Sequence, residues 1–341
     1  MKRKNILLIG LGHHSRRIYF PKLVKFEKNY PIKVVAGVEL NFSKKRIDEY
    51  FKEKGRSIDM LYLDLFDSQK GMPKEVEDKL NSLVKEKDIE AVVISTDPLS
   101  HKVYAQWALK NGLHILMDKP ISTRKHVSTN IEAAEGIEQD YFDLLDQYKD
   151  LQKTKDTIFS VNVQRRYEAG FLKVFELINE VTQKFNAPIT SIQAMHSDGV
   201  WIFPDEIVEQ KSHPYSEGYG KCSHSGYHIF DIIWRFYLSG LPKGKEPDAA
   251  EVFTSFINPG GLLKQFSLED YQSYFGEEMK KYQKHSEKEL FNIFENYGEN
   301  DSFSVVRFLK ENHAVCNVSI NLLHNSFSRR SWMTPSKDLY K

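Results

Sequence analysis

The sequence predicts an α/β protein in which an N-terminal doubly wound parallel sheet precedes a C-terminal α+β domain with a mostly antiparallel sheet. Three observations predict this fold class. Short apolar runs alternate with helical patterns over residues 5–120. A glycine-containing turn follows the first run, and alternation of polar with apolar residues becomes common after residue 189. We place the first domain at residues 1–123 and the second at residues 124–341.

The strands of the first domain are predicted from runs that are almost continuous in valine, isoleucine and leucine, as in parallel strands covered on both faces. Helical patterns and short connections separate them, which favours repeated βαβ units. The first run is too short for a signal peptide and lacks a small-residue cleavage site, so it is interpreted as a strand. The predicted strands are residues 6–9, 33–38, 60–63, 91–95 and 114–117, and the predicted helices are residues 14–26, 43–54, 73–85 and 100–110.

The composition excludes several classes of protein. The chain has 341 residues, with 48 basic and 47 acidic side chains and a net charge of +1, so no basic field favours nucleic acid or an anionic membrane surface. Cys222 and Cys316 are its two cysteines, too few for a disulfide framework. No stretch is long and apolar enough to span a bilayer. We expect a cytoplasmic protein with no nucleic-acid or membrane partner.

The turn after the first strand predicts a dinucleotide-binding Rossmann domain. Residues 5–15 have the sequence NILLIGLGHHS. Gly10 and Gly12 would let the backbone approach a pyrophosphate, and the following helix would offer its N-terminus to the negative charge. Ser15 occupies the third position of the G-x-G-x-x-G pattern, so the match is incomplete. The expected cofactor-binding residues of this turn are Gly10, Gly12, His13, Ser15 and Arg16.

Glu39, at the end of the second predicted strand, favours NAD over NADP. A carboxylate there can accept hydrogen bonds from both ribose hydroxyls and would repel a 2′-phosphate. NADP stays possible, because Lys44, Lys45 and Arg46 follow closely and could clamp a phosphate. The alternative is that these three residues form a solvated helix face.

The loops after the fourth and fifth predicted strands are placed for chemistry, because ligands of parallel sheets bind beyond the carboxyl ends of the strands. Thr96 and His101 follow the fourth strand, and Lys119 follows the fifth. Thr96 and His101 are expected at the cofactor. A lysine at this edge can hold a substrate hydroxyl and help to move its proton.

These motifs carry a resemblance. GLGHHS at residues 10–15 and STDPLSHKVYAQWALKNGLHILMDKP at residues 95–120 resemble the Gfo/Idh/MocA family, named for glucose–fructose oxidoreductase, inositol dehydrogenase and rhizopine catabolism. The family has Glu-Lys-Pro where residues 118–120 are Asp-Lys-Pro, and Thr-Pro-Asn where residues 96–98 are Thr-Asp-Pro. The resemblance covers the first 120 residues and implies a dehydrogenase in which Lys119 contacts both cofactor and substrate.

A second informative stretch, residues 218–236, has the sequence GYGKCSHSGYHIFDIIWRF. Helical spacing gives it a buried apolar stripe and a polar line that contains His224 and His228. The family has Asp-x-Gly-x-His here, which implies that His228 is the acid/base and puts His224 at the aspartate. His224 could share the proton relay, or the site could have drifted from dehydrogenation. The pair could also bind metal or be structural, and we predict no metal site.

Other residues are expected on the substrate side. Members of the family have an arginine-aromatic pair near the substrate, which here is Arg166 and Tyr167. Arg166 could grip a hydroxyl, phosphate or carboxylate, or it could tie loops together. Tyr167, Trp201 and Tyr227 could stack on a sugar face, or they could belong to the core.

The rest of the second domain is less regular. Insertions are expected near residues 124–150 and 260–298, and the first is either an inserted lobe or lid, or a surface excursion. No clear final strand appears in residues 332–341, so we expect natural residues beyond Lys341. By analogy with the family, an exposed face of the antiparallel sheet is the expected contact of a homo-oligomer.

Three functions fit the sequence. The leading prediction is a nicotinamide-dependent oxidoreductase, with NAD or alternatively NADP as cofactor, that acts on a small molecule: a sugar, polyol or sugar derivative. The second is a non-catalytic dinucleotide sensor, which the incomplete glycine pattern and His224 favour. The third is a redox-neutral reaction that uses tightly bound NAD. Lys119 and His228 argue for catalysis.

Overall fold

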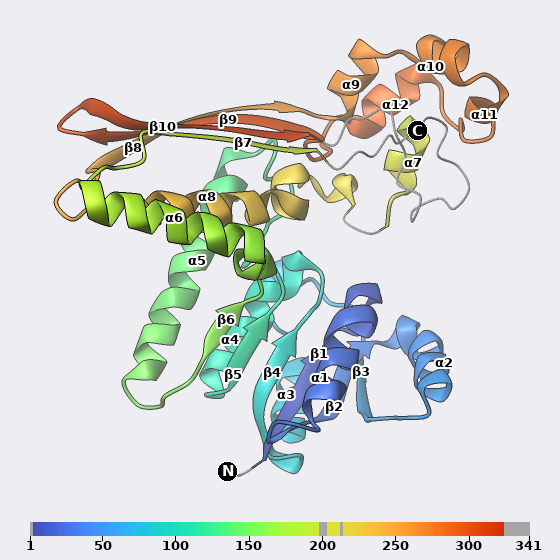
Figure 1. The fold of residues 1–341 in the computed structure, drawn as a ribbon. Coiled ribbons are helices and arrows are strands. Elements are labelled where there is room, and N and C mark those ends of the chain that lie inside the picture. Colours follow the sequence, from blue (N-terminus) through green and yellow to red (C-terminus); the bar gives the residue numbers. More distant parts are fainter. Residues whose placement is uncertain (1–2, 198–202, 212–213, 324–341) are drawn as a thin grey trace. The chain divides into compact units, whose positions relative to one another are not determined.

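The computed structural model describes residues 3–197, 203–211 and 214–323 (Figure 1). The chain forms two compact units. The first unit comprises Met1–Arg124 and Glu135–Asn162, and the second comprises Lys125–Ala134 and Val163–Lys341. This division differs from the boundary expected after residue 123, because residues 135–162 return to the first unit.

The first unit is built on a six-stranded parallel sheet in the order β3-β2-β1-β4-β5-β6. This order places the first strand at the centre, as in a doubly wound Rossmann sheet, and confirms the predicted fold class. The strands are β1 (Lys4–Ile9), β2 (Ile32–Leu40), β3 (Asp59–Leu63), β4 (Ile89–Ile94), β5 (His114–Met117) and β6 (Phe159–Val161).

Helices cover both faces of this sheet, because successive side chains of a strand point to opposite faces. Leu7 and Leu8 of β1 are both fully buried, and each belongs to a different core cluster. The helix patterns predicted from sequence correspond to the first four helices, whereas the segment that contains most of α5 was expected as an insertion of the second domain. The helices are α1 (Phe20–Phe26), α2 (Lys44–Lys54), α3 (Lys74–Glu86), α4 (His101–Lys110) and α5 (Ile131–Gln152).

Helix α5 is held to the first unit by a buried carboxylate. Asp140 is 2% exposed, and it accepts hydrogen bonds from Lys102 Nζ at 2.6 Å, Arg124 Nη2 at 2.6 Å and Ser122 Oγ at 2.7 Å. Gly136 makes room for this arrangement, because a Cβ there would overlap the guanidinium of Arg124. Residues 135–150 therefore pack as an integral helix of the first unit, and not as an inserted lobe or a surface excursion.

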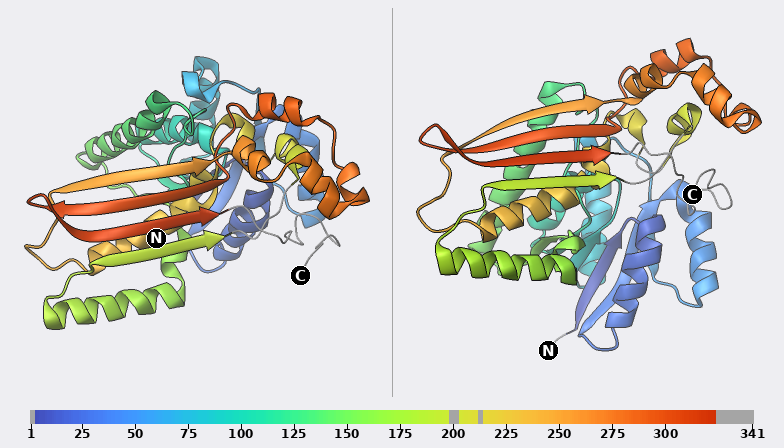
Figure 2. Two further views of the ribbon diagram at one scale, coloured as in Figure 1. Left: turned by 90° about the horizontal axis from the view of Figure 1, so that it is seen from above. Right: turned by 45° about the horizontal axis from the view of Figure 1, so that its top comes forward.

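The second unit contains a four-stranded sheet in the order β7-β10-β9-β8, in which only β7 and β10 are parallel. Helices α6 (Ala169–Phe185) and α8 (Tyr227–Ser239) lie on one face (Figure 2). Tyr237 of α8 stacks on Phe308 of the sheet at a centroid distance of 4.1 Å. The strands are β7 (Ser191–Ser197), β8 (Ala249–Ile257), β9 (Asp301–Lys310) and β10 (His313–Leu323).

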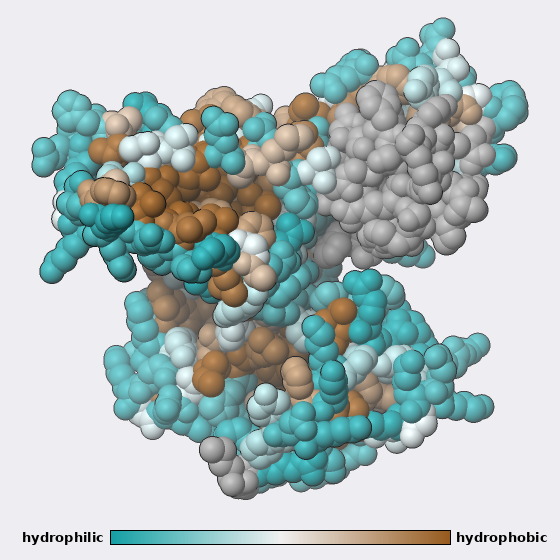
Figure 3. All heavy atoms as spheres, in the orientation of Figure 1, coloured by the Kyte–Doolittle hydropathy of each residue, from teal (hydrophilic) through white to brown (hydrophobic). Residues whose placement is uncertain are grey.

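Some apolar side chains of these two helices stay exposed. Val181 and Phe185 of α6 are 50% and 64% exposed, and Trp234 of α8 is 51% exposed. Figure 3 shows hydrophobic surface in the region of α6 and α8. The second unit thus presents apolar surface that its own described residues do not cover.

The charged stretch expected as an insertion between residues 260 and 298 is a set of short helices between β8 and β9. Ser267 and Ser286 cap α10 and α12, each in a capping box with the acidic residue three positions later. These helices share an apolar core with α7, and Phe203 and Leu290 are fully buried in it. The helices are α7 (Pro204–Glu209), α9 (Pro259–Gln265), α10 (Leu268–Phe275), α11 (Glu277–Lys280) and α12 (Glu287–Phe294).

Within residues 3–197, 203–211 and 214–323, no helix has the combination of length and hydropathy that crossing a membrane requires.

The Asp140 cluster makes a prediction about stability. Burial alone would raise the pKa of Asp140, but its hydrogen bonds from Arg124, Lys102 and Ser122 outweigh burial and lower it. Asp140→Asn should reduce the free energy of unfolding of the first unit by about 3 kcal/mol, because it breaks a buried ion cluster. Because the pKa is lowered on folding, this loss should be complete above about pH 4 and shrink as pH falls further.

Denaturant unfolding followed by circular dichroism measures this loss. Asp150→Asn is the control, because Asp150 and Lys153 pair on the surface of α5 with about 70% of each side chain exposed, and such pairs contribute about 0–1 kcal/mol. Equal stability of the two variants at pH 7 would contradict the assignment.

Candidate functional site

Gly10 fixes the turn between β1 and α1. Its φ is +86°, and a Cβ there would lie 2.5 Å from the carbonyl oxygen of Ser95. The Gly10 N–H donates to Val38 O at 2.9 Å, and the Ser95 N–H donates to Ile9 O at 2.8 Å. Only glycine meets both the conformational and the steric requirement. Gly12 differs, because a Cβ there would have no neighbour among the described residues within 4 Å. Gly12 therefore leaves open space beside the turn.

Ser15 and Arg16 continue the turn. Ser15 is fully buried, and its Oγ has no hydrogen-bond partner within the part of the chain that the structure describes. A small side chain therefore fits where the third glycine of the pattern packs helix against strand. Arg16 Nε donates to Leu11 O at 3.1 Å, so this group braces the turn. His13 is exposed.

Glu39 joins the end of β2 to the glycine turn. Its Oε2 accepts from the Leu11 N–H at 2.8 Å, and its Oε1 accepts from the Leu40 N–H at 2.9 Å. The carboxylate is therefore oriented before any ligand binds. Lys44 and Lys45 are exposed and line a surface pocket at the start of α2.

His101 holds two loops together. It is fully buried, with Nδ1 2.7 Å from Pro120 O and Nε2 3.3 Å from Thr96 O. Burial lowers the pKa of His101. We expected His101 at the cofactor, but its side chain is enclosed between the loops after β4 and β5. Thr96 is partly exposed and belongs to the edge where ligands of such sheets bind.

Lys119 pairs with a buried carboxylate at the end of β5. Its Nζ lies 3.4 Å from Asp118 Oδ2, and the lysine side chain is 12% exposed. The other oxygen, Asp118 Oδ1, accepts from Tyr19 OH at 2.8 Å, and Tyr19 OH accepts from Asn162 Nδ2 at 2.7 Å. Sequence reasoning missed Tyr19 and Asn162. They are 143 residues apart, so no local spacing could have indicated their contact.

In the second unit, the stretch before α8 has a different geometry from the one expected. Cys222–Gly226 forms a wide turn of the π type, and the regular helix starts at Tyr227. The α-helical spacing that put His224 and His228 on one face therefore does not apply throughout. No group of three or more metal-ligating side chains occurs among the described residues.

The two histidines have separate surroundings. His224 packs against the rings of Tyr215 and Tyr219, at centroid distances of 4.9 and 5.4 Å. Both tyrosines are fully buried. His228 is 5% exposed and packs against Tyr227 at 4.3 Å.

Glu299 is a further residue at this turn that sequence reasoning missed. Its side chain is 3% exposed, and it accepts from the Cys222 N–H at 2.7 Å and from Ser128 Oγ. Burial, and then the charge of Glu299, raise the pKa of Cys222 to about 12. The cysteine is therefore a thiol, and Glu299 fixes the start of the turn that bears His224.

Arg166 is already paired. Its guanidinium contacts the carboxylate of Asp231 on α8, with Nε 3.0 Å from Oδ2 and a second contact from Nη2 to Oδ1. The hydrogen bond to Asp231 raises the pKa of Arg166. Of the two sequence interpretations, the structure displays the one in which Arg166 ties segments together. Tyr167 is 71% exposed, Tyr227 is partly exposed, and Trp201 lies outside the described residues.

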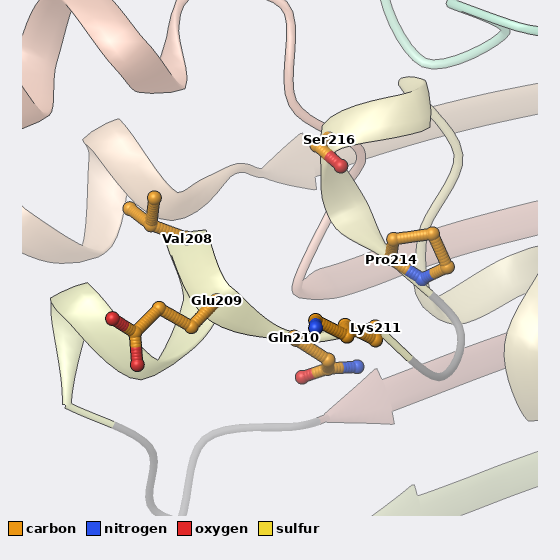
Figure 4. A pocket seen from close by; sticks show the side chains of 6 residues that line it. All are labelled: Val208, Glu209, Gln210, Lys211, Pro214 and Ser216. Carbon is orange, nitrogen blue, oxygen red and sulfur yellow. The ribbon is translucent and has the colours of Figure 1, made fainter.

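A pocket of the second unit contains none of the expected site residues. Figure 4 shows that its labelled side chains come from α7 and the segments that follow it. The lining residues are Val208, Glu209, Gln210, Lys211, Pro214 and Ser216.

The sheet order and the glycine turn define a dinucleotide-binding Rossmann domain. Residues 4–139 match the model of the GFO_IDH_MocA family, described as "Oxidoreductase family, NAD-binding Rossmann fold". Residues 4–139 therefore match the NAD-binding Rossmann domain of the Gfo/Idh/MocA family of NAD(P)-dependent oxidoreductases. A comparison with curated proteins finds no match.

Solved structures share the fold of nearly the whole chain. The aldose-aldose oxidoreductase from Caulobacter crescentus, complexed with glycerol, is 12% identical with a TM-score of 0.57, over 95% of this chain and 72% of that one. The WlbA dehydrogenase from Bordetella pertussis, in complex with NADH and UDP-GlcNAcA, is 12% identical with a TM-score of 0.57, over 96% and 72%. A putative myo-inositol dehydrogenase from Sinorhizobium meliloti 1021 is 14% identical with a TM-score of 0.54, over 96% and 71%.

The two glycines should respond differently to alanine. Gly10→Ala should lower the free energy of unfolding by at least about 2 kcal/mol, because the new Cβ meets the Ser95 backbone at positive φ. Gly12→Ala should keep the wild-type stability, because its Cβ enters open space, but it should weaken NAD binding by about tenfold or more, or about 1.4 kcal/mol. Calorimetric titration with NAD and thermal denaturation test both variants. Wild-type NAD affinity in Gly12→Ala would show that the cofactor does not approach the turn.

Proposed function

We propose that the protein is a dehydrogenase that moves a hydride between a carbinol carbon of a sugar, polyol or sugar derivative and NAD. The pairing of Lys119 with the buried Asp118 is the observation that carries this proposal. A partly buried ammonium group at the carboxyl edge of a parallel sheet is suited to hold an alcohol oxygen close to a bound nucleotide.

The first unit fits NAD. Gly12 leaves space beside the turn, and the buried Oγ of Ser15 has no partner among the described residues. Glu39 is oriented by two backbone N–H groups and would accept from the adenosine ribose hydroxyls. Its charge would repel a 2′-phosphate, which favours NAD over NADP. When bound, NAD supplies the hydride acceptor.

The substrate side is proposed from chemistry that several relatives share. The names of the similar structures include glycerol, UDP-GlcNAcA and myo-inositol, all of which carry several hydroxyl groups. We take a polyhydroxylated small molecule as the substrate class. Lys119 would donate a hydrogen bond to the reacting hydroxyl oxygen, and His228 would accept the hydroxyl proton as the carbinol is oxidised to a carbonyl. An imidazole suits this task because it exchanges protons near neutral pH.

A non-catalytic dinucleotide sensor is the second candidate. Two observations favour it: Arg166 is occupied by Asp231, and His224 packs against Tyr215 and Tyr219 where the family has an aspartate. A sensor would bind NAD without turnover of any polyol. A redox-neutral enzyme would turn over its substrate without releasing free NADH.

Substitution of Lys119 and His228 distinguishes these candidates. Lys119→Met and His228→Asn should each lower kcat with the best substrate of a polyol panel by about 10²–10⁴-fold, and His228→Asn should bind NAD with wild-type affinity. NADH absorbance measures turnover, and calorimetry measures binding. Lys110→Met is the control, because Lys110 is 72% exposed. Full activity of Lys119→Met would contradict the proposed role.

Glu39 offers a test of cofactor preference. Glu39→Ala should weaken NAD binding by about tenfold, because two hydrogen bonds to the ribose are lost. It should also reduce the preference for NAD over NADP, because the repulsion of a 2′-phosphate disappears. Parallel titrations of both nucleotides measure the ratio of affinities. An unchanged ratio would contradict the role of this carboxylate.

We also propose that the outer face of the second sheet contacts another copy of the chain. One face of the sheet packs against α8. The cross-strand register places Phe253, Phe303 and Met195 on the opposite face of the sheet. Their side chains are 63%, 42% and 71% exposed. Apolar side chains gathered on one face suit a self-complementary interface.

This proposal is tested by sedimentation. The double variant Phe253→Glu, Phe303→Glu should dissociate the oligomer, because charge enters the apolar face. Val252→Glu is the control, because Val252 is similarly exposed but its register places it on the opposite face. A monomeric wild-type protein, or an unchanged oligomer in the double variant, would contradict the proposed interface.

A further inference from the structure

We propose that Tyr19 and Asn162 are positioning residues for Lys119 and act through Asp118. The inference rests on the proposed role of Lys119 and extends it to two side chains that lie outside the glycine turn and the Asp-Lys-Pro sequence. The phenol of Tyr19 fixes one oxygen of Asp118, so that the other oxygen holds the ammonium group of Lys119 toward its substrate.

The hydrogen bonds from Asn162 to Tyr19 and from Tyr19 to Asp118 can run in only one donor-to-acceptor direction. Asn162 Nδ2 can only donate, so the oxygen of Tyr19 accepts from it at 2.7 Å. The O–H of Tyr19 then points to Asp118 Oδ1, 2.8 Å away. Asp118 Oδ2 is left for Lys119 Nζ at 3.4 Å. Because the carboxylate is planar, fixing Oδ1 also fixes the direction in which Oδ2 attracts the ammonium group.

Three separate segments provide these groups. Tyr19 comes from the wide turn Ser15–Tyr19 at the start of α1, Asp118 follows β5, and Asn162 follows β6. Neighbouring strands of the sheet, β5 and β6, set the spacing between the last two. Asn162 therefore connects the edge strand of the sheet to the lysine.

Burial makes the hydrogen bonds of Tyr19 and Asp118 energetically important. Tyr19 is 5% exposed and Asp118 is 7% exposed, and a buried carboxylate needs donors to offset the loss of water. Burial, and then the charge of Asp118, raise the pKa of Tyr19. The residue is therefore a phenol, and a donor to Asp118, throughout the neutral range.

Other titratable groups lie around Asp118 and Lys119. The ring of His14 lies 5.5 Å from that of Tyr19. Burial lowers the pKa of His14, Asp118 opposes this, and Lys119, Arg17 and His13 add to it. On the other side, Asp118 and Asp97 raise the pKa of the buried His101, but burial outweighs them. Both His14 and His101 are thus neutral near pH 7, and the carboxyl group that contacts Lys119 Nζ is that of Asp118.

Chemical labelling of Lys119 tests the inference without any substrate. Trace acetic anhydride acetylates an uncharged amine, so the pH at the midpoint of labelling, followed by mass spectrometry, reports proton loss from Lys119. In Tyr19→Phe the carboxylate loses a donor and holds the ammonium group more strongly, so the midpoint should rise by up to about one pH unit. In Asp118→Asn the anion is gone, and the midpoint should fall.

Two further variants complete the experiment. Asn162→Ala should raise the midpoint in the same direction as Tyr19→Phe, by a smaller amount. Tyr148→Phe is the matched control, because its hydroxyl donates to Thr157 O at 3.0 Å in the same unit, away from Asp118. Its labelling midpoint should equal that of the wild type, and Lys110 provides an internal standard in every sample.

The outcomes separate this inference from the proposed function. Equal midpoints in Tyr19→Phe and Tyr148→Phe would overturn the inference, whatever the enzyme turns over. If Tyr19→Phe does not fold, Asn162→Ala and Asp118→Asn decide by the opposite directions of their shifts. Turnover that persists in Lys119→Met would instead overturn the proposed function and leave the labelling result intact. With an active substrate, Tyr19→Phe should lower kcat by about tenfold and leave NAD affinity unchanged.

Discussion

The close approach of Gly10 to the backbone of Ser95 is the constraint on which the first unit depends. A side chain at Gly10 would separate the ends of β1 and β4, and these two strands lie side by side at the centre of the sheet. The turn that leaves Gly10 presents the Leu11 N–H to Glu39. The same sheet edge continues to β5, where Lys119 follows. One steric requirement therefore sets the spacing of the nucleotide turn, its acidic partner and the lysine.

Buried carboxylates hold together segments of the first unit that are distant in sequence. Asp118 contacts Tyr19 and Lys119, and Asp140 contacts Lys102 and Arg124. Each anion lost its water on folding, and several donors replace that water. Each cluster needs all of its donors in place, since removing any donor leaves a carboxylate that is poorly solvated. Hydrogen bonds and ion pairs to a few buried acidic side chains thus hold loops of the first unit in place.

The strands and most helices of the first unit could be predicted because their signals are local: apolar runs, helical spacing and glycine turns. The segment of α5 was assigned to an insertion of the second domain because the buried surface of this helix is narrow. Only Gly136, Asp140 and Leu144 are buried over its 22 residues, so its sequence resembles a surface segment. The contacts of His101, Arg166 and Tyr19 could not be predicted, because each depends on a partner from another element. A sequence shows that a histidine or an arginine is available, but burial and pairing decide what it does.

The departure of His224 from the family pattern has a structural counterpart. An aspartate at this position would be a charged group against the rings of Tyr215 and Tyr219, which are both fully buried. An imidazole can pack against such rings in its neutral form, at much lower desolvation cost. A carboxyl group at the same turn comes from Glu299, which accepts from the Cys222 N–H. Glu299 lies in the segment just before β9, far from His224 in the sequence, so no local sequence pattern could have indicated its place at this turn.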